Sequence, residues 1–255
     1  MTYPRLNKTS APIISTYDNS ILFAHSNLTD FNKNIHMVFA TLNEWFRANR
    51  LSLNFNKTNY VHFTAKRNMS VNLKMGYNNN LITNSSYTKF LGVTMDNILS
   101  WNNHIDLLMK KFIMVCYIIR NAKTYMSAST LRMIHHAFFH LAMSYGIIFW
   151  GNSSHSSTIF SMQTKAIRII EECENGVSCR NLVKKLQILP LTSQYMLSLL
   201  MFVVQNKNLF STNTENHNID TRQTNNLYLP QANNHLSKRR LLFGDKNLYC
   251  FTLGD

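Results

Sequence analysis

Acidic residues are scarce in this sequence. Its 255 residues contain 12 Asp and Glu against 26 Lys and Arg, which gives a formal net charge of +14. With so few carboxylates, the chain repels a polyanion only weakly. Its positive charge therefore favours nucleic acid or an anionic membrane surface as the partner. A basic protein without such a partner is the alternative that charge alone leaves open.

Glycine and cysteine are also few. The seven glycines form no cluster, which excludes a Gly-rich phosphate-binding loop. The four cysteines are scattered and no secretory signal precedes them, so free thiols in a reducing compartment are expected. Cys173 and Cys179 have five residues between them, which is not the spacing of a zinc ribbon or finger. We therefore expect an intracellular protein, in nucleus or cytoplasm, without a cysteine metal site.

Long apolar runs are missing as well. The longest candidates, 112–119 and 195–204, fall short of the ~20 residues that cross a bilayer. We expect no membrane span and interpret both as buried helices. With 45% apolar residues, the chain can still bury a sizeable core.

One histidine pair has a spacing that can bind zinc. His136 and His140 lie four residues apart, on one face of an expected helix. The metalloprotease glutamate and a third nearby ligand are both missing, so core or surface histidines are the favoured interpretation. No nucleophile-elbow pattern supports a serine hydrolase either.

The first hundred residues alternate strand-like and helical patterns. Apolar runs at 12–14 and 21–24 flank a polar tip at 17–20, which predicts a β-hairpin. A helix should follow, with Thr29 or Asp30 as N-cap. Its expected apolar face consists of Phe31, Ile35, Val38, Phe39, Leu42, Trp45 and Phe46, and its polar face of Asn32, Lys33, His36, Asn43 and Arg47. Further strands are predicted at 58–64, 71–75, 81–84 and 87–94.

Beyond Leu99 the pattern becomes helical. Ile105, Leu108, Met109, Phe112, Val115, Cys116 and Ile119 recur at helical spacing, and further helices are predicted at 131–143, 159–170, 182–186 and 195–204. From 206 the composition turns polar, with a basic stretch at 237–249. The residues thus predict an α+β chain with domains 1–99 and 100–205, and a poorly ordered tail at 206–255.

Six blocks in a fixed order carry a family likeness. They are STYDNSILF (15–23), LNEWFRANRLSLNFNKTNYVHF (42–63), YTKFLGVTMDNILSWNNHI (87–105), SYGIIFWG (144–151), MQTKAIRII (162–170) and DTRQTNNLYLP (220–230). Together they resemble the C-terminal half of the reverse transcriptase of jockey-like non-LTR retrotransposons, from about residue 13 to about residue 243. The resemblance implies a partial palm, an antiparallel sheet with one packed helix, at 1–99 and an all-helical thumb-like region after it. The tail beyond Leu242 departs from the family.

The resemblance places the palm's metal-binding tip at the first hairpin. Thr16 matches the family's aromatic residue, Tyr17 its alanine, Asp18 its first aspartate and Asn19 its second. Two metal ions roughly 4 Å apart need anionic oxygen ligands. Asp18 is retained as a metal ligand, but Asn19 is neutral, and the 17 residues before Asp18 contain no Asp or Glu. We therefore expect weak Mg²⁺ binding. The resemblance implies an RNA-directed DNA polymerase, and the missing carboxylates predict that it is inactive.

The remaining site residues also come from the resemblance. Lys57 matches a lysine that could act as an acid toward the pyrophosphate leaving group, with a solvated turn lysine as the alternative. Lys89, Phe90, Leu91, Gly92 and Val93 match the primer-grip hairpin, where Gly92 would allow the primer strand to approach, although a bulge is the simpler interpretation. Lys110, Lys111, Arg120 and Lys123 could follow a duplex backbone, or form an ordinary solvated helix face.

These expectations define a truncated reverse transcriptase with residual, non-specific binding to RNA, DNA or an RNA–DNA duplex. They include no membrane and no small-molecule cofactor. Two other hypotheses stay open. The first is a binding or interaction protein co-opted from such a fragment, and the second is an unselected reading frame whose uncovered sheet edge promotes aggregation. The sequence also leaves open whether a longer product or a partner chain supplies the upstream half.

Overall fold

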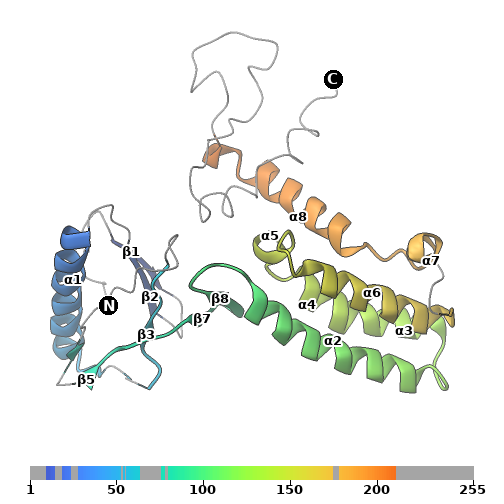
Figure 1. Cartoon of the computed structure of the whole chain (residues 1–255), viewed down its shortest axis with the longest axis horizontal. Helices are drawn as coiled ribbons and strands as arrows, with labels where there is room; N and C mark the ends of the chain where they lie inside the picture. Colours follow the sequence, from blue (N-terminus) through green and yellow to red (C-terminus); the bar gives the residue numbers. More distant parts are fainter. Residues whose placement is uncertain are drawn as a thin grey trace, which may run out of the picture. The chain divides into compact units, whose positions relative to one another are not determined.

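The computed structural model describes residues 10–14, 19–23, 28–52, 54, 56–63, 76–77, 80–174 and 178–210. The chain forms two compact units (Figure 1). The first comprises Met1–His62 and Lys66–Ser86, and the second comprises Phe63–Ala65 and Tyr87–Asp255.

The first unit begins with the predicted β-hairpin. Strand β1 (Ser10–Ile14) pairs antiparallel with β2 (Asn19–Phe23), and Ile14 lies opposite Asn19. The hairpin is confirmed, but the predicted tip at 17–20 is wrong at its C-terminal end. Asn19 and Ser20 already belong to β2, because the apolar residues that follow them extend the pairing to the start of the strand. Asp18 lies outside the described residues.

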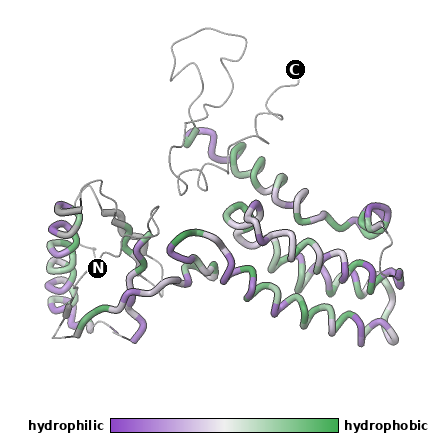
Figure 2. The backbone as a smooth tube through the Cα atoms, viewed as in Figure 1, coloured by the Kyte–Doolittle hydropathy of each residue, from purple (hydrophilic) through white to green (hydrophobic). Residues whose placement is uncertain are grey.

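Helix α1 (Leu28–Ala48) packs as its sequence pattern predicts. Ile35, Val38 and Leu42 are buried, and the alternation of hydrophobic and hydrophilic turns along the helix is visible in Figure 2. Two details differ from the expectation. The helix begins at Leu28, so neither Thr29 nor Asp30 is its N-cap. Asn43 is half-buried rather than solvent-facing, and its side-chain oxygen has no hydrogen-bond partner.

The remaining strands of this unit are short and do not form one sheet. β3 (Asn59–Tyr60) pairs with β6 (Thr83–Asn84) in parallel, and β4 (Gly76–Tyr77) pairs with β5 (Asn80–Leu81) antiparallel. Among the described residues, the expected single antiparallel sheet is therefore wrong. Each of these pairs joins only two residues per strand. Such short strands offer few hydrogen bonds to a further strand. The strand predicted at 71–75 lies outside the described ranges.

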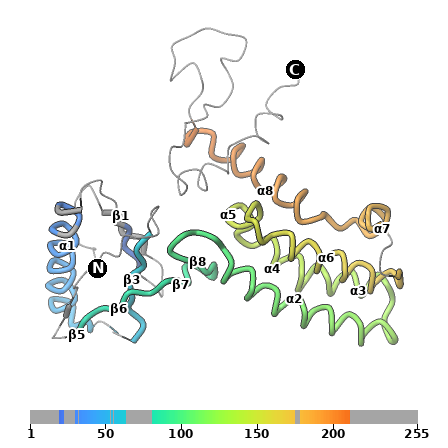
Figure 3. The backbone as a smooth tube through the Cα atoms, viewed as in Figure 1, coloured from blue at the N-terminus to red at the C-terminus, as the bar shows by residue number. Residues whose placement is uncertain are grey.

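The second unit opens with another β-hairpin. β7 (Tyr87–Phe90) pairs antiparallel with β8 (Val93–Asp96). From β8 the chain passes directly toward α2 (Figure 3), and the contacts group this hairpin with the helices. The compact units therefore divide after residue 86, which differs from the expected boundary at residue 99. The reason is a set of hydrogen bonds that join this hairpin to the chain after it. Leu91 accepts from Tyr145, Asp96 accepts from Trp101, and Thr94 donates to His104.

The described helices of this unit include every predicted one. They are α2 (Asn102–Ala122), α3 (Ala128–Ile134), the π-helix η1 (His135–His140), α4 (Leu141–Ser144), α5 (Ile147–Trp150), α6 (Ser156–Glu171), α7 (Cys179–Leu186), α8 (Leu191–Gln205) and the 3₁₀-helix η2 (Lys207–Leu209). The segment predicted at 131–143 is continuous but changes to π-helix in its middle, and α5 was not predicted.

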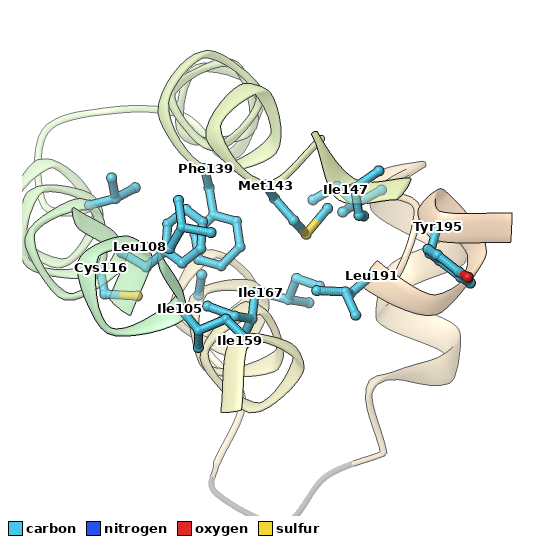
Figure 4. Close-up of a cluster of buried hydrophobic side chains, with 14 of the residues drawn as sticks. Ile105, Leu108, Cys116, Phe139, Met143, Ile147, Ile159, Ile167, Leu191 and Tyr195 are labelled. Atoms are coloured by element: carbon cyan, nitrogen blue, oxygen red, sulfur yellow. The ribbon is translucent and has the colours of Figure 1, made fainter. Parts of the chain in front are cut away.

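One hydrophobic core joins these helices (Figure 4). Phe112 of α2 stacks on Phe139 of η1 at 3.9 Å between ring centroids, and both rings are fully buried. Ile167 of α6 and Leu191 of α8 lie in the same cluster. Two aromatic rings of this size provide a large share of the apolar area that stabilises the unit.

The π-helix keeps the middle helix facing this core. Leu131, His135, Phe139 and Met143 are buried and four residues apart. In an α-helix, steps of four residues advance by about 40° more than a full turn, so these side chains would spiral away from one face. The wider π turn removes this drift, so that all four residues face inward.

None of the described helices is by itself long and apolar enough to cross a membrane. Helices α7 and α8 together meet the length and composition test, but they are bent by 52° with respect to one another.

Candidate nucleic-acid interface

The tip of the β7–β8 hairpin contains the five residues that the resemblance assigns to the primer grip. Phe90 lies opposite Val93, so Leu91 and Gly92 form a two-residue turn, with φ of +44° and +83°. Positive φ at both central positions is typical of the type I′ turn, whose twist matches that of paired strands. Gly92 adopts this geometry freely, whereas Leu91 is held there at a cost of about 1–3 kcal/mol.

A tyrosine from the helical region holds this strained tip. The hydroxyl of Tyr145 donates a hydrogen bond to the carbonyl oxygen of Leu91. Its ring covers Gly92 closely enough that a Cβ there would lie 3.3 Å from the Tyr145 Cε1 atom. The carbonyl of Tyr145 in turn accepts a hydrogen bond from Nε1 of the buried Trp150, at 3.2 Å. The hairpin tip is therefore anchored to the core through two successive hydrogen bonds.

Gly146 makes this approach possible. Its φ of +61° turns the chain between α4 and α5, and a Cβ at this position would lie 3.1 Å from the Cγ2 atom of Val93. A larger residue would strain the backbone and push the hairpin away. Tyr145 and Gly146, which lie in the block SYGIIFWG (144–151), thus both position the hairpin.

The base of the hairpin is fixed by Asp96. Its buried carboxylate accepts hydrogen bonds from the backbone N–H groups of Ile98, Ser100 and Trp101 and from the hydroxyl of Ser100, at 2.8–3.1 Å. These bonds shape the loop between β8 and α2. They end at Trp101, the residue that precedes α2, so Asp96 holds the chain up to the start of this helix.

His104 connects the same strand to the core. Its Nδ1 atom accepts a long, 3.4 Å hydrogen bond from the backbone N–H of Thr94, and its ring lies 5.8 Å from the ring of Trp150. Burial, followed by the positive charge of Lys111, lowers the pKa of His104 to about 4. The imidazole is therefore neutral near pH 7, which leaves Nδ1 free to accept this bond.

Helix α2 presents the predicted cationic residues to solvent, but not as a uniform polar face. Lys110, Lys111 and Arg120 are exposed. Lys123 is half-buried and forms an ion pair with Glu172 at 3.1 Å, so part of its charge is neutralised. Ile113, Met114 and Tyr117 lie between these cations and are also exposed, which the prediction of a polar outer face did not anticipate.

Asn19 and Lys57 are the described residues of the first unit that the resemblance assigns to catalysis, and they lie on different elements. Lys57 is exposed in a turn in which its backbone N–H donates to the carbonyl of Asn54 at 3.1 Å. Asn19 lies in β2, and Asp18 is outside the described residues. No group of three or more His, Cys, Asp or Glu side chains in the described ranges could hold a metal ion. Weak Mg²⁺ binding through Asp18 therefore stays a prediction.

The histidines of η1 are held by packing. His135 is fully buried, stacks on Phe139 at 5.0 Å and has no hydrogen-bond partner at either ring nitrogen. Burial first, and then the neighbouring His136 and His140, lower its pKa to about 3. His136 and His140 lie 5.4 Å apart between ring centroids. The buried, stacked histidine is thus His135, whereas His136 and His140, the pair with the zinc-like spacing, are half-buried.

Sequence reasoning missed the residues that position this region. Tyr145 and Gly146 lie in a block quoted only for its likeness, and Asp96 was not singled out. Asp96 did have a local signal, since an aspartate four residues before a serine can accept hydrogen bonds in a capping loop. Tyr145 had none, because its partner Leu91 is 54 residues away.

Comparison with known proteins relates part of this chain to a transposon protein. The chain has a distant similarity to the reverse transcriptases of transposable elements. The relative in question is a probable RNA-directed DNA polymerase from transposon BS of Drosophila melanogaster, 24% identical over 168 residues. The match covers 63% of this chain and 18% of the relative, so the chain corresponds to a small part of that protein. No family model and no solved structure matches the chain.

Proposed function

We propose that this chain is a nucleic-acid-binding fragment of a jockey-like retrotransposon reverse transcriptase. In this proposal, the first unit derives from the palm and the helices of the second unit from the thumb. The similarity to a transposon polymerase is the observation that carries the proposal. The net charge of +14 and the exposed cations of α2 support it, because a phosphate backbone is the partner they suit.

In this proposal the hairpin at Lys89–Val93 is a primer grip. Its support is the rigid attachment of the tip, since Tyr145 fixes the Leu91 carbonyl and the ring over Gly92 leaves the backbone turn in one geometry. A rigid turn would bind a strand without a further entropic cost of ordering.

We also infer that the chain does not polymerise DNA. Asp18 and Asn19 supply one negative charge where the family has two, and a neutral amide is a poor ligand for a metal that must bind triphosphate. A purified sample that extends an oligo(dT) primer on poly(A) in Mg²⁺, and loses the activity on Asp18→Ala, would contradict this inference.

The binding itself is tested by salt dependence. An RNA–DNA duplex should bind with an affinity that falls steeply between 50 and 200 mM salt, because phosphate contacts release counterions. Lys110→Gln/Lys111→Gln should reduce the slope of log K against log salt by about 1–2. The matched control, Arg180→Gln/Lys184→Gln, removes two exposed charges from α7 and should change the slope less. Equal effects of the two pairs would assign the binding to net charge alone, and no binding would refute the proposal.

A further inference from the structure

Exposed aromatic rings lie next to the hairpin tip, and the proposed primer grip does not account for their exposure. Tyr145, which follows α4, is 55% exposed, and Phe149 of α5 is 51% exposed. The ring of the half-buried Trp101 lies 6.3 Å from that of Phe149 (centroid to centroid), at an interplanar angle of 32°. We call Trp101, Tyr145 and Phe149 the aromatic surface.

Two residues of the aromatic surface are held by hydrogen bonds, Tyr145 through its ring and its backbone, and Trp101 through its backbone. Tyr145 is held at its hydroxyl by Leu91 and at its carbonyl by Trp150, and the backbone N–H of Trp101 is bound by Asp96. Rings that are already ordered lose little conformational entropy when a ligand stacks on them. The surface therefore has the rigidity that a stacking platform requires.

The charges around the surface favour a polyanion over an acidic or neutral partner. The segments 87–103 and 144–154 contain two residues that are charged at pH 7, Lys89 and Asp96. Asp96 is buried and its carboxylate accepts four hydrogen bonds, so it presents no free negative charge. Lys89 is exposed, two residues before Leu91 on the same hairpin. Within these two segments the exposed charge is thus a cation, and the next exposed carboxylate along the chain after Trp101 is Asp106 of α2.

From this combination we propose that the aromatic surface stacks unpaired bases of a single-stranded segment, while Lys89 contacts its phosphates. Every base has a flat π face, so such a platform is tolerant of sequence and adds to an electrostatic contact. This inference rests on the proposed function, since it assigns to the nucleic-acid-binding chain a preference for a duplex with a single-stranded overhang.

The test compares three DNA probes of equal duplex length. One is blunt, one carries a four-nucleotide overhang containing 2-aminopurine, and one carries an overhang of four abasic nucleotides with the same charge. The chain should bind the base-containing overhang most tightly and quench its 2-aminopurine fluorescence. Phe149→Ala should weaken this binding by about fivefold or more, and leave the blunt and abasic probes unchanged.

Phe138→Ala is the matched control. Phe138 is 58% exposed on η1 and contributes no ring to the aromatic surface, so its loss should leave all three probes unchanged. Circular dichroism and the melting temperature should show that both variants fold, because both side chains are exposed.

Three outcomes would overturn the inference. If the wild-type chain binds the base-containing and abasic overhangs equally, bases are not recognised. If Phe138→Ala weakens binding as much as Phe149→Ala, general apolar contact explains the effect. If Phe149→Ala changes only self-association in sedimentation, the surface docks a protein. In each case a salt-dependent affinity for the blunt duplex would leave the proposed function standing, whereas failure to bind any probe would refute both.

Discussion

At the scale of single residues, two buried histidines make the protein sensitive to acid. His104 is 5% exposed and His135 is fully buried, and burial lowers their pKa values to about 4 and about 3. The unfolded chain protonates both near pH 6.5, well before the folded chain does. Their neutral forms therefore favour the folded state fully above about pH 6.5, and this contribution is lost as the pH falls toward the folded values.

We accordingly expect the free energy of unfolding to fall by about 2 kcal/mol between pH 6 and pH 5, with both histidines contributing. Urea unfolding across this range measures it. His135→Leu, which removes one titrating group while keeping an apolar side chain in the stack, should reduce the fall by about half. An unchanged pH dependence in this variant would show that His135 is not responsible.

At the scale of elements, a glutamine joins two helices that sequence reasoning treated as separate. Gln163 of α6 is fully buried; its Nε2 donates to the carbonyl of Leu189, and its Oε1 accepts from the backbone N–H of Leu191, each at 2.9 Å. Leu191 is the first residue of α8, which follows Pro190. Both groups of the amide are used, so Gln163 satisfies backbone atoms of the segment that leads into α8.

Gln163→Met keeps the volume but takes the partner from the buried N–H of Leu191 and from the part-buried carbonyl of Leu189. It should lower the free energy of unfolding by about 2–4 kcal/mol, since each unsatisfied group costs about 1–3 kcal/mol. Chemical denaturation measures the change. Gln205→Met, at an exposed position of α8, is the control and should change stability by less than about 0.5 kcal/mol.

Helical periodicity was the most informative sequence signal at this scale. Ile105, Phe112 and Ile119 repeat every seven residues, and this local pattern predicted α2 and its buried face. The same method could not find the parallel pairing of β3 with β6, which depends on residues about 24 positions apart. It also missed the π turn, because the buried residues of η1 are as apolar or aromatic as those of an ordinary helix.

At the scale of the whole molecule, the hairpin β7–β8 belongs with the helices. Asp96 holds the loop that leads into α2, and Tyr145 fixes the hairpin tip. The resemblance placed residues 87–99 with the palm, because it follows the order of the chain and cannot reveal contacts made 54 residues later. The candidate interface is thus partly predictable. The sequence pointed to the hairpin at 89–93, but not to Tyr145 and Asp96, which hold it.

Truncation tests this division. A fragment of Tyr87–Asp255 should fold cooperatively, because it keeps the larger compact unit intact. A fragment of Ser100–Asp255 should be less stable by about 2 kcal/mol or more, since it loses the Asp96 bonds and uncovers Trp150 and His104. Thermal unfolding of both fragments by circular dichroism measures this. Equal melting temperatures would show that the hairpin is independent of the helices.

The contact between Tyr145 and Leu91 also bears on the order of folding. Both the I′ turn and helix α2 are local structures that can form within microseconds. The hydroxyl of Tyr145 can reach Leu91 only after α2, α3, η1 and α4 have packed, because a loop of 54 residues must first close. This contact should therefore be absent from the folding transition state, so that its loss speeds unfolding and leaves the folding rate almost unchanged. The hairpin tip is then the part of the second unit that opens first, and its amide protons should exchange with solvent before those of the core.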